Sequence, residues 1–207
     1  MSIIFILEIF GVVSFAISGA IVGVEKKMDV FGVAILGLTT AVGGGILRDL
    51  ILGITPPSAF QDPSFAVTAI AVSLIVFFPG IRSGAKRRRK IYDKLMLLVD
   101  SMGLGLFTVV SVQIAREAIP DANNFLVTFV GVLTGIGGGI MRDLFAGHIP
   151  NIFVKHFYAS ASLIGAWTCA LLWPVGGEAV SMITGAAVTI LLRLLAAHYR
   201  WSLPTAR

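Results

Sequence analysis

Seven long, predominantly apolar stretches constrain this chain more than any other feature of its sequence. Each approaches the roughly 20 residues that an α-helix needs to cross the hydrocarbon core of a bilayer. Because no water is available there, a spanning segment must satisfy its own backbone hydrogen bonds, so we expect every stretch to be a helix. The predicted spans cover about residues 3–24, 30–53, 64–81, 94–115, 125–147, 156–174 and 178–199.

Composition argues against a soluble fold. Apolar residues make up 57% of the 207 residues and charged residues only 13%, whereas a typical soluble domain is about 25% charged. So few polar groups cannot cover a globule, and the remaining apolar surface must face lipid or a partner. The sequence therefore predicts a single all-α integral membrane domain over residues 1–207. The alternating segments of a membrane β-barrel are not visible.

The basic residues predict the orientation of the chain, because Lys and Arg concentrate in cytoplasmic loops. Segment 82–94, RSGAKRRRKIYDK, carries seven of them, and placing it in the cytoplasm leaves only Arg116 in an outer loop. We therefore expect a multi-pass protein of the inner (plasma) membrane, with its N-terminus outside and its C-terminus in the cytoplasm. The basic run could also indicate nucleic-acid binding. No set of base-stacking aromatic residues is interleaved with it, so we expect contact with anionic lipid instead and no nucleic-acid partner.

A 14-residue segment occurs twice. GGGILRDLILGITP at 43–56 and GGGIMRDLFAGHIP at 137–150 lie 94 positions apart and share nine identical residues. The first three spans thus correspond to the next three, and the second copy must enter the membrane from the opposite side because three is odd. We predict an inverted repeat, in which transport sites form between the copies near the midplane. A purely structural duplication is the alternative. The predicted parts are a first three-helix repeat at 1–81, a second at 91–174, and a seventh helix with a cytoplasmic tail at 178–207.

Each copy of the segment begins with three glycines near the centre of its span. A glycine inside a helix costs about 1 kcal/mol relative to alanine, and opened backbone within a membrane is tolerated only inside protein or beside a watery cavity. We therefore expect both helices to be broken or kinked at the triplets and to line a pore there. Close helix packing across small residues is the alternative, and the two are compatible. The glycines are Gly43, Gly44 and Gly45 in the second span and Gly137, Gly138 and Gly139 in the fifth.

An Arg–Asp pair follows each triplet, Arg48-Asp49 and Arg142-Asp143. Arg48 begins roughly 10 Å from the middle of its span, inside the hydrocarbon half-thickness of roughly 15 Å. A charge at that depth usually faces the helix bundle and has a partner. Reaching out to the membrane surface is the alternative.

Two acidic residues of other spans lie at matching depths. Glu8 lies in the first span at the depth of Arg48, and Asp100 lies in the fourth at the depth of Arg142. We predict that the pairs Glu8–Arg48 and Asp100–Arg142 act as gates at opposite ends of one pathway. Asp49 and Asp143 would be second partners of the arginines or hydrogen-bond acceptors at a helix terminus.

Signatures of catalysis and of cofactor binding are not visible. The sequence has no nucleotide-binding loop, no HExxH and no Ser/His/Asp arrangement. The spacing of His, Cys and carboxylates does not support a metal site. We expect a protein that is not an enzyme and that has no cofactor or metal.

The topology and the paired GGGxxRD motifs resemble those of the trimeric intracellular cation (TRIC) channel family, in its prokaryotic branch. The resemblance covers essentially the whole chain. It implies a homotrimer in which each protomer has its own pore, lined by the second and fifth helices. It also implies permeation of monovalent cations, chiefly K⁺, with the glycine triplets and both Arg–Asp pairs in the pore region.

The same branch includes relatives regarded as glycine transporters, so transport of glycine or another small neutral amino acid is the alternative. The amides at a half-helix N-terminus could bind the carboxylate of a zwitterion, and backbone carbonyls could bind its ammonium group.

Overall fold

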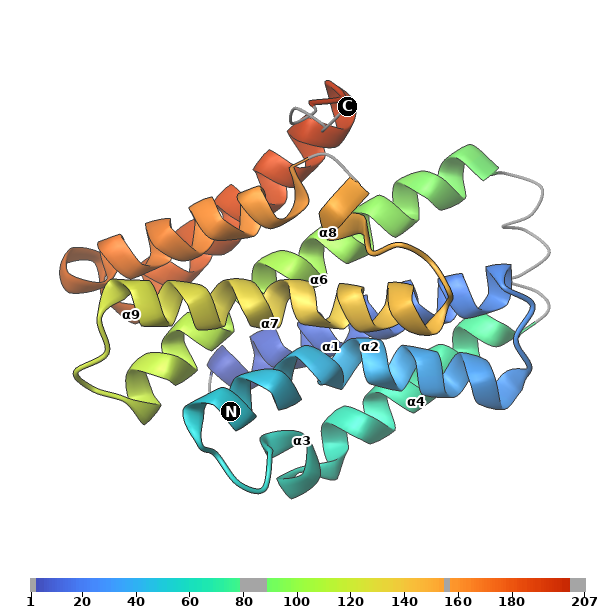
Figure 1. Cartoon of the computed structure of the whole chain (residues 1–207), viewed down its shortest axis with the longest axis horizontal. Coiled ribbons are helices and arrows are strands. Elements are labelled where there is room, and N and C mark those ends of the chain that lie inside the picture. The colour runs from blue at the N-terminus through green and yellow to red at the C-terminus, as the bar shows by residue number, and fades with distance from the viewer. Residues whose placement is uncertain (1–2, 79–88, 155–156, 202–207) are drawn as a thin grey trace.

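The computed structural model describes residues 3–78, 89–154 and 157–201, and these are helical or in connecting turns (Figure 1). Most of segment 82–94, where anionic lipid contacts are expected, lies outside the described residues. The helices are α1 Ile3–Glu25, α2 Val30–Leu52, α3 Ser58–Gln61, α4 Pro63–Phe77, α6 Arg89–Ala118, α7 Asn124–Phe145, α8 Asn151–Val154 and α9 Tyr158–His198.

Five helices of the described chain are long and apolar enough to cross a membrane, namely α1, α2, α6, α7 and α9. The all-helical membrane fold is therefore confirmed. Helix α4 has 15 residues, fewer than the span predicted at 64–81, whose last residues lie outside the described part. Helix α9 covers both the sixth and seventh predicted spans. A count of seven spanning helices stays a prediction, because it depends on α4 crossing the membrane and on α9 crossing it twice.

Helix α9 is divided into two arms near its middle. Gly177 has φ 68° and ψ −179°, a backbone conformation that favours glycine over other residues. Figure 1 shows that the chain reverses there, so the two arms run antiparallel. They touch at two further glycines, because a Cβ atom on Gly165 would lie 2.6 Å from the carbonyl oxygen of Gly185. The reversal brings the end of α9 back towards the start of its first arm.

Proline helps to form this reversal and leaves one carbonyl without its helical partner. Pro174 lies inside α9 and has no N–H to donate to the carbonyl four residues earlier, that of Ala170. Arg116 of α6 supplies a donor instead, with its Nη2 3.0 Å from the Ala170 oxygen. The same guanidinium lies over the ring of Trp173, 5.3 Å from its centroid. Arg116 thus holds α9 against α6 beside the reversal.

Helices α2 and α7 run antiparallel through the middle of the molecule (Figure 1). Each begins at a side chain that caps its first turn: the carboxylate of Asp29 accepts from the N–H of Gly32, and the amide oxygen of Asn123 accepts from the N–H of Leu126. Each is followed by a glycine with positive φ, Gly53 at 73° and Gly147 at 69°. The two copies of the repeated segment therefore fold alike and point in opposite directions.

A break at the glycine triplets was expected and is wrong, whereas a kink without a break stays a prediction. Helix α2 is continuous through Gly43–Gly45, and α7 is continuous through Gly137–Gly139. The glycines instead let the two backbones touch. A Cβ atom on Gly44 would collide with the carbonyl oxygen of Thr134, and one on Gly138 would collide with that of Thr40. Helical hydrogen bonding is kept, and the missing side chains are used for close packing.

This crossing is self-complementary. Thr134 is the counterpart of Thr40 in the repeat, and Gly138 is the counterpart of Gly44. Gly44 contacts Thr134 and Gly138 contacts Thr40, so exchanging the two copies turns one contact into the other. A two-fold axis produces this pattern. The geometry fits an inverted repeat, whereas the residue boundaries given above for its parts stay predictions.

Candidate functional site: two charged clusters at opposite ends of α2 and α7

Each copy of the repeated segment builds a buried cluster at the C-terminal end of its helix. The first charged cluster consists of Glu8, Arg48, Asp49 and Ser58. The second charged cluster consists of Ser18, Asp100, Arg142, Asp143 and Asn151. Because α2 and α7 are antiparallel, the two clusters lie at opposite ends of the helix pair.

In the first charged cluster, Arg48 is buried and every nitrogen of its guanidinium has a partner. Its Nε donates to Asp49 at 2.7 Å, its Nη1 to Glu8 at 3.3 Å and its Nη2 to the hydroxyl of Ser58 at 3.0 Å. The other oxygen of Asp49 accepts from the backbone N–H of Ser58 at 2.7 Å and from its hydroxyl. Ser58 is the first residue of α3, so the carboxylate joins the end of α2 to the start of this short helix.

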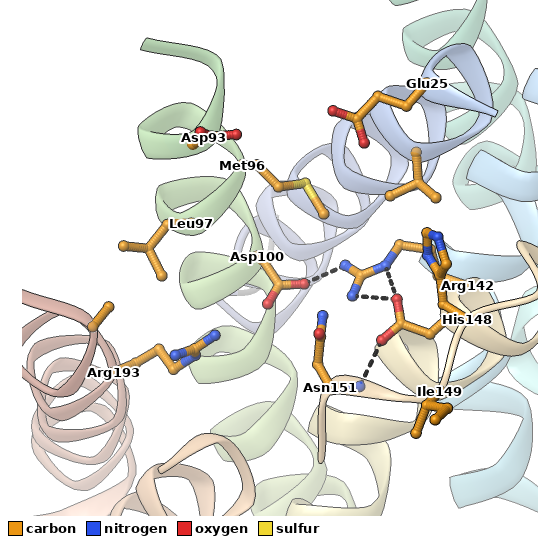
Figure 2. Close-up of a pocket in the computed structure, with 13 residues that line it drawn as sticks. Glu25, Asp93, Met96, Leu97, Asp100, Arg142, His148, Ile149, Asn151 and Arg193 are labelled. Atoms are coloured by element: carbon orange, nitrogen blue, oxygen red, sulfur yellow. Dashed lines mark hydrogen bonds and ion pairs between the residues drawn. The ribbon is translucent and has the colours of Figure 1, made fainter. Parts of the chain in front are cut away.

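The second charged cluster repeats the pattern around Arg142, whose exposed fraction is 0% (Figure 2). Its Nε donates to Asp143 at 2.9 Å, and its Nη1 lies 2.5 Å from both Asp100 and the hydroxyl of Ser18. The other oxygen of Asp143 accepts from the backbone N–H of Asn151 at 2.8 Å. Asn151 begins α8, so this carboxylate too joins a long helix to a short one.

The structure thus brings together both expected pairs, Glu8 with Arg48 and Asp100 with Arg142, and neither arginine reaches out to a membrane surface. The two aspartates that follow the arginines are their second partners. Whether the clusters act as gates stays a prediction. Sequence reasoning missed Ser18 and the two short helices. The prolines before Ser58 and Asn151 gave a signal for the helices, because proline favours the first turn of a helix.

The space beside the two clusters differs greatly. Next to the second charged cluster lies a cavity of about 680 Å³, which we call the vestibule. Next to the first lies a pocket of about 30 Å³, walled by Phe65, Phe107 and Ala59 among others. Between the clusters, the rings of Phe15 and Phe107 pack 5.3 Å apart, and α2 and α7 touch at their glycines. Side chains and backbone thus occupy the space between the two clusters.

Among the described residues that line the vestibule, acids outnumber bases. Figure 2 shows Asp100 and Arg142 at its wall, with Arg193 entering from the second arm of α9. The guanidinium of Arg193 lies 4.9 Å from the ring centroid of Tyr158. Neither residue belongs to a repeated motif, so the duplication gave no signal for them. The charged residues of the vestibule are the acids Glu25, Asp93, Asp100 and Asp143 and the bases Arg142 and Arg193.

The six triplet glycines have different surroundings. Gly45 lines the small pocket of the first cluster, and a Cβ atom on Gly139 would face the hydroxyl of Tyr158 at 2.8 Å. Gly43 packs on the sulfur of Met141, and Gly137 packs on the backbone of Gly44. Within the described part of the chain, three or more His, Cys, Asp or Glu side chains do not come together as a metal site would require.

Comparison with known proteins identifies the family. A family model described as "Glycine transporter" matches residues 5–79 and 97–174. A UPF0126 inner membrane protein of Escherichia coli K12, YadS, is 36% identical over 96% of this chain and 94% of its own length.

Two solved structures are also similar to this chain over nearly its whole length. One, described under conductance through TRIC cation channels, is 34% identical, with a TM-score of 0.84 over 100% of this chain and 98% of the other. The TRIC orthologue from Rhodobacter sphaeroides is 31% identical, with a TM-score of 0.87 over 97% of this chain and 100% of the other. Matches of this extent show that the chain is a multi-pass membrane protein that belongs to the TRIC family.

Proposed function

We propose that this protein is a channel for monovalent cations, chiefly K⁺, with one pathway in each protomer between α2 and α7. The observation that carries the proposal is the charge balance at the two ends of this helix pair. Each arginine is within ion-pairing distance of two carboxylates: Glu8 and Asp49 for Arg48, and Asp100 and Asp143 for Arg142. Each cluster therefore carries a net negative charge.

This balance of charge explains how arginines could lie in a cation path. A lone buried guanidinium would repel K⁺ strongly, because charges interact over long distances in a medium of low polarity. An arginine neutralised by one carboxylate leaves the second carboxylate to attract a cation. The four acids and two arginines of the vestibule extend the negative charge to its mouth, and acidic rings are a common basis of cation selectivity. The solved relatives described as cation channels support the same function.

Conduction requires a rearrangement of the conformation described here. The narrowest part is the contact of α2 with α7 at Gly44 and Gly138, where the backbones touch. We propose that these helices separate by sliding, and that the two arginines exchange partners as they do so. The glycine triplets would then form the middle of the pathway, with the Arg–Asp pairs at its ends.

The assembly and the location follow from the relatives and from the charge pattern. The Rhodobacter relative is described as a trimeric channel, and we propose a homotrimer for this chain. The E. coli relative is described as an inner membrane protein, and we propose the same membrane here. From the distribution of basic residues we propose that the N-terminus lies outside. The vestibule, which lies at the end of α7 and the start of α6, would then be on the cytoplasmic side.

Reconstituted protein tests the proposal directly. In liposomes with an outward K⁺ gradient, the protein should carry K⁺ at a rate that follows the membrane potential and does not saturate at low concentration. A chloride gradient should produce little flux, because the clusters are negative. Protein-free liposomes and protein with Gly44→Leu, in which the added side chain blocks the crossing, are the controls. K⁺ flux no greater than that of protein-free liposomes would refute the channel.

Transport of glycine is the second candidate, and one observation favours it. The space at one end of the inverted repeat is far larger than at the other, an asymmetry expected of a carrier that alternates between two states. The name of the matching family model points the same way. A carrier would show saturable uptake of labelled glycine that is accelerated by unlabelled glycine on the other side. Such counterflow without K⁺ conductance would establish the carrier and exclude the channel.

A further inference from the structure

A second large cavity of the molecule lies outside the α2–α7 pathway. It has a volume of about 540 Å³ and lies between the first turns of α6 and the last turns of α9. Its wall is aliphatic, formed by Leu97 of α6 and by leucines of α9. The α9 residues that line it include Leu191, Leu194, Leu195 and His198. We call this the α6–α9 groove.

On the α9 side of the groove, the lining residues form a continuous stripe that is apolar along most of its length and polar at its end. Residues three, four and seven positions apart share one face of a helix, and Leu191, Leu194, Leu195 and His198 have this spacing. Leu191 is 58% exposed and Leu195 is 42% exposed. The stripe therefore runs from exposed leucines within the membrane span to an imidazole at its end.

Basic side chains gather at that same end. Lys94 of α6 and Arg200, just beyond α9, both line the groove and are exposed. None of the described residues that line the groove is acidic. The groove therefore combines an apolar wall with a basic rim, which is complementary to the acyl chain and the phosphate of an anionic lipid.

Neighbouring aromatic residues place the rim at the level of the lipid headgroups. Tyr199 is 64% exposed and Trp201 is 40% exposed, and their rings stack 6.5 Å apart beside Arg200. Exposed tyrosine and tryptophan concentrate where a membrane meets water. The basic rim is thus at the depth of a phosphate group, and the leucines are at the depth of the acyl chains.

We propose that the α6–α9 groove binds an anionic phospholipid, with its phosphate against Lys94 and Arg200 and one acyl chain along the leucines of α9. Leu97 and Ala197 line both this groove and the vestibule. The bound lipid therefore lies against the wall of the vestibule. This proposal does not depend on which solute the protein carries.

Tryptophan quenching tests the proposal, because Trp201 lies next to the rim. The full-length protein carrying Trp167→Phe and Trp173→Phe retains Trp201 as its single tryptophan. It is reconstituted into phosphatidylcholine vesicles that contain a minor fraction of either brominated phosphatidylglycerol or brominated phosphatidylcholine. Bromine quenches tryptophan only at short range, so the ratio of the two quenching efficiencies reports lipid preference at the groove.

The test variant is Arg200→Gly with Lys94→Gln. Arg200 has φ 53°, a conformation that glycine adopts more easily than arginine. Arg200→Gly should therefore remove the charge without destabilising the fold. The control is Lys27→Gly with Lys26→Gln. Lys27 is also exposed and has φ 59°, so the control makes the same changes of charge and backbone away from the groove.

We expect the parent protein to prefer brominated phosphatidylglycerol. The preference should fall about five-fold for each basic residue removed from the rim and stay unchanged in the control. The proposal is overturned if the parent shows no preference, as when a second copy of the chain covers the groove. It is equally overturned if the rim variant keeps the preference or if the control loses as much, since attraction would then belong to the whole basic surface.

Discussion

The two charged clusters are built from the same repeated segment, yet the space beside one is far larger than the space beside the other. Both join an arginine to two carboxylates, and both use the second oxygen of an aspartate to hold the first N–H of a short helix. The first has about 30 Å³ of space beside it and the second about 680 Å³. The arginine and aspartate of the repeated segment thus provide the shared part of the ion pairing, and residues outside that segment determine how much space lies beside it.

The covering residues explain this difference. Aromatic rings of α4 and α6, Phe65 and Phe107, close the space at the first cluster. At the second, the wall is formed partly by the second arm of α9, which has no counterpart in the first half. That arm contributes Arg193 and Ala197 to the vestibule. One additional helix is therefore enough to make a symmetric pair of sites functionally unequal.

The largest difference between the clusters should appear when the arginines are removed. Arg142→Ala leaves two carboxylates in a site where the guanidinium was 0% exposed, and breaking a buried ion pair costs about 3–5 kcal/mol. Arg48→Ala should cost less, because its partner Glu8 keeps a side-chain exposure of 16%. Thermal unfolding in detergent measures both. Equal losses would show that the two sites are equally buried in solution.

The crossing of α2 and α7 should respond nearly equally on its two sides. A Cβ atom on Gly44 or Gly138 would strike the carbonyl oxygen of a threonine on the other helix, and overpacking of this kind costs about 1–3 kcal/mol. Gly138→Ala should be the more harmful, because its Cβ would also lie 2.8 Å from the ring of Phe15.

Gly45→Ala is the matched control within the same triplet. The nearest neighbour of its Cβ atom would be Nη2 of Arg48 at 3.8 Å, an ordinary contact, so both stability and K⁺ flux should be retained. Stability and flux measured for all three variants distinguish the roles of the glycines. A loss at Gly45 equal to that at Gly44 would indicate that helix flexibility, and not close packing, is what the triplet provides.

The two short helices are held in different ways, and alanine substitution should separate them. The hydroxyl of Ser58 bonds to both Arg48 and Asp49, and a hydrogen bond to a charged group contributes about 1.5–3 kcal/mol. Asn151 uses its backbone N–H for the equivalent bond. Ser58→Ala should therefore lower the unfolding temperature, and Asn151→Ala should leave it nearly unchanged. The opposite order would mean that the clusters are not held as described.

The smallest effect is expected at Arg193, the residue that α9 adds to the charges of the vestibule. Arg193→Gln removes a positive charge from the proposed cation path while keeping much of the side-chain volume over Tyr158. K⁺ flux should rise by about two- to five-fold at low ionic strength and approach that of the parent in concentrated salt, because salt screens such interactions. Flux that is unchanged at every salt concentration would show that the ions do not pass this residue.

The helices were the part of the structure most readily predicted from the sequence. The span predicted at 30–53 is observed at Val30–Leu52, and the one predicted at 125–147 is observed at Asn124–Phe145. Polar caps and glycines mark these ends clearly. The partners of the arginines were also found, because a charge within a membrane needs an opposite charge at its own depth.

The state of the glycine triplets could not be predicted in the same way. A missing side chain lowers the stability of a helix and also lets another helix approach, and the sequence alone does not say which effect is used. The answer depends on the carbonyl groups of Thr40 and Thr134, which reach the triplets only through the tertiary fold. The role of Arg193 was missed for a similar reason, because it depends on where α9 returns.

The hydrogen bond between Arg116 and the Ala170 carbonyl bears on how such a chain is inserted into a bilayer. In the proposed orientation, Arg116 is the one basic residue outside the repeated motifs that faces away from the cytoplasm, and it would ordinarily oppose translocation of its loop. Here its guanidinium donates a hydrogen bond to the backbone carbonyl that Pro174 leaves without a donor. An apparent exception to the usual distribution of positive residues is thereby explained as a requirement of the folded hairpin.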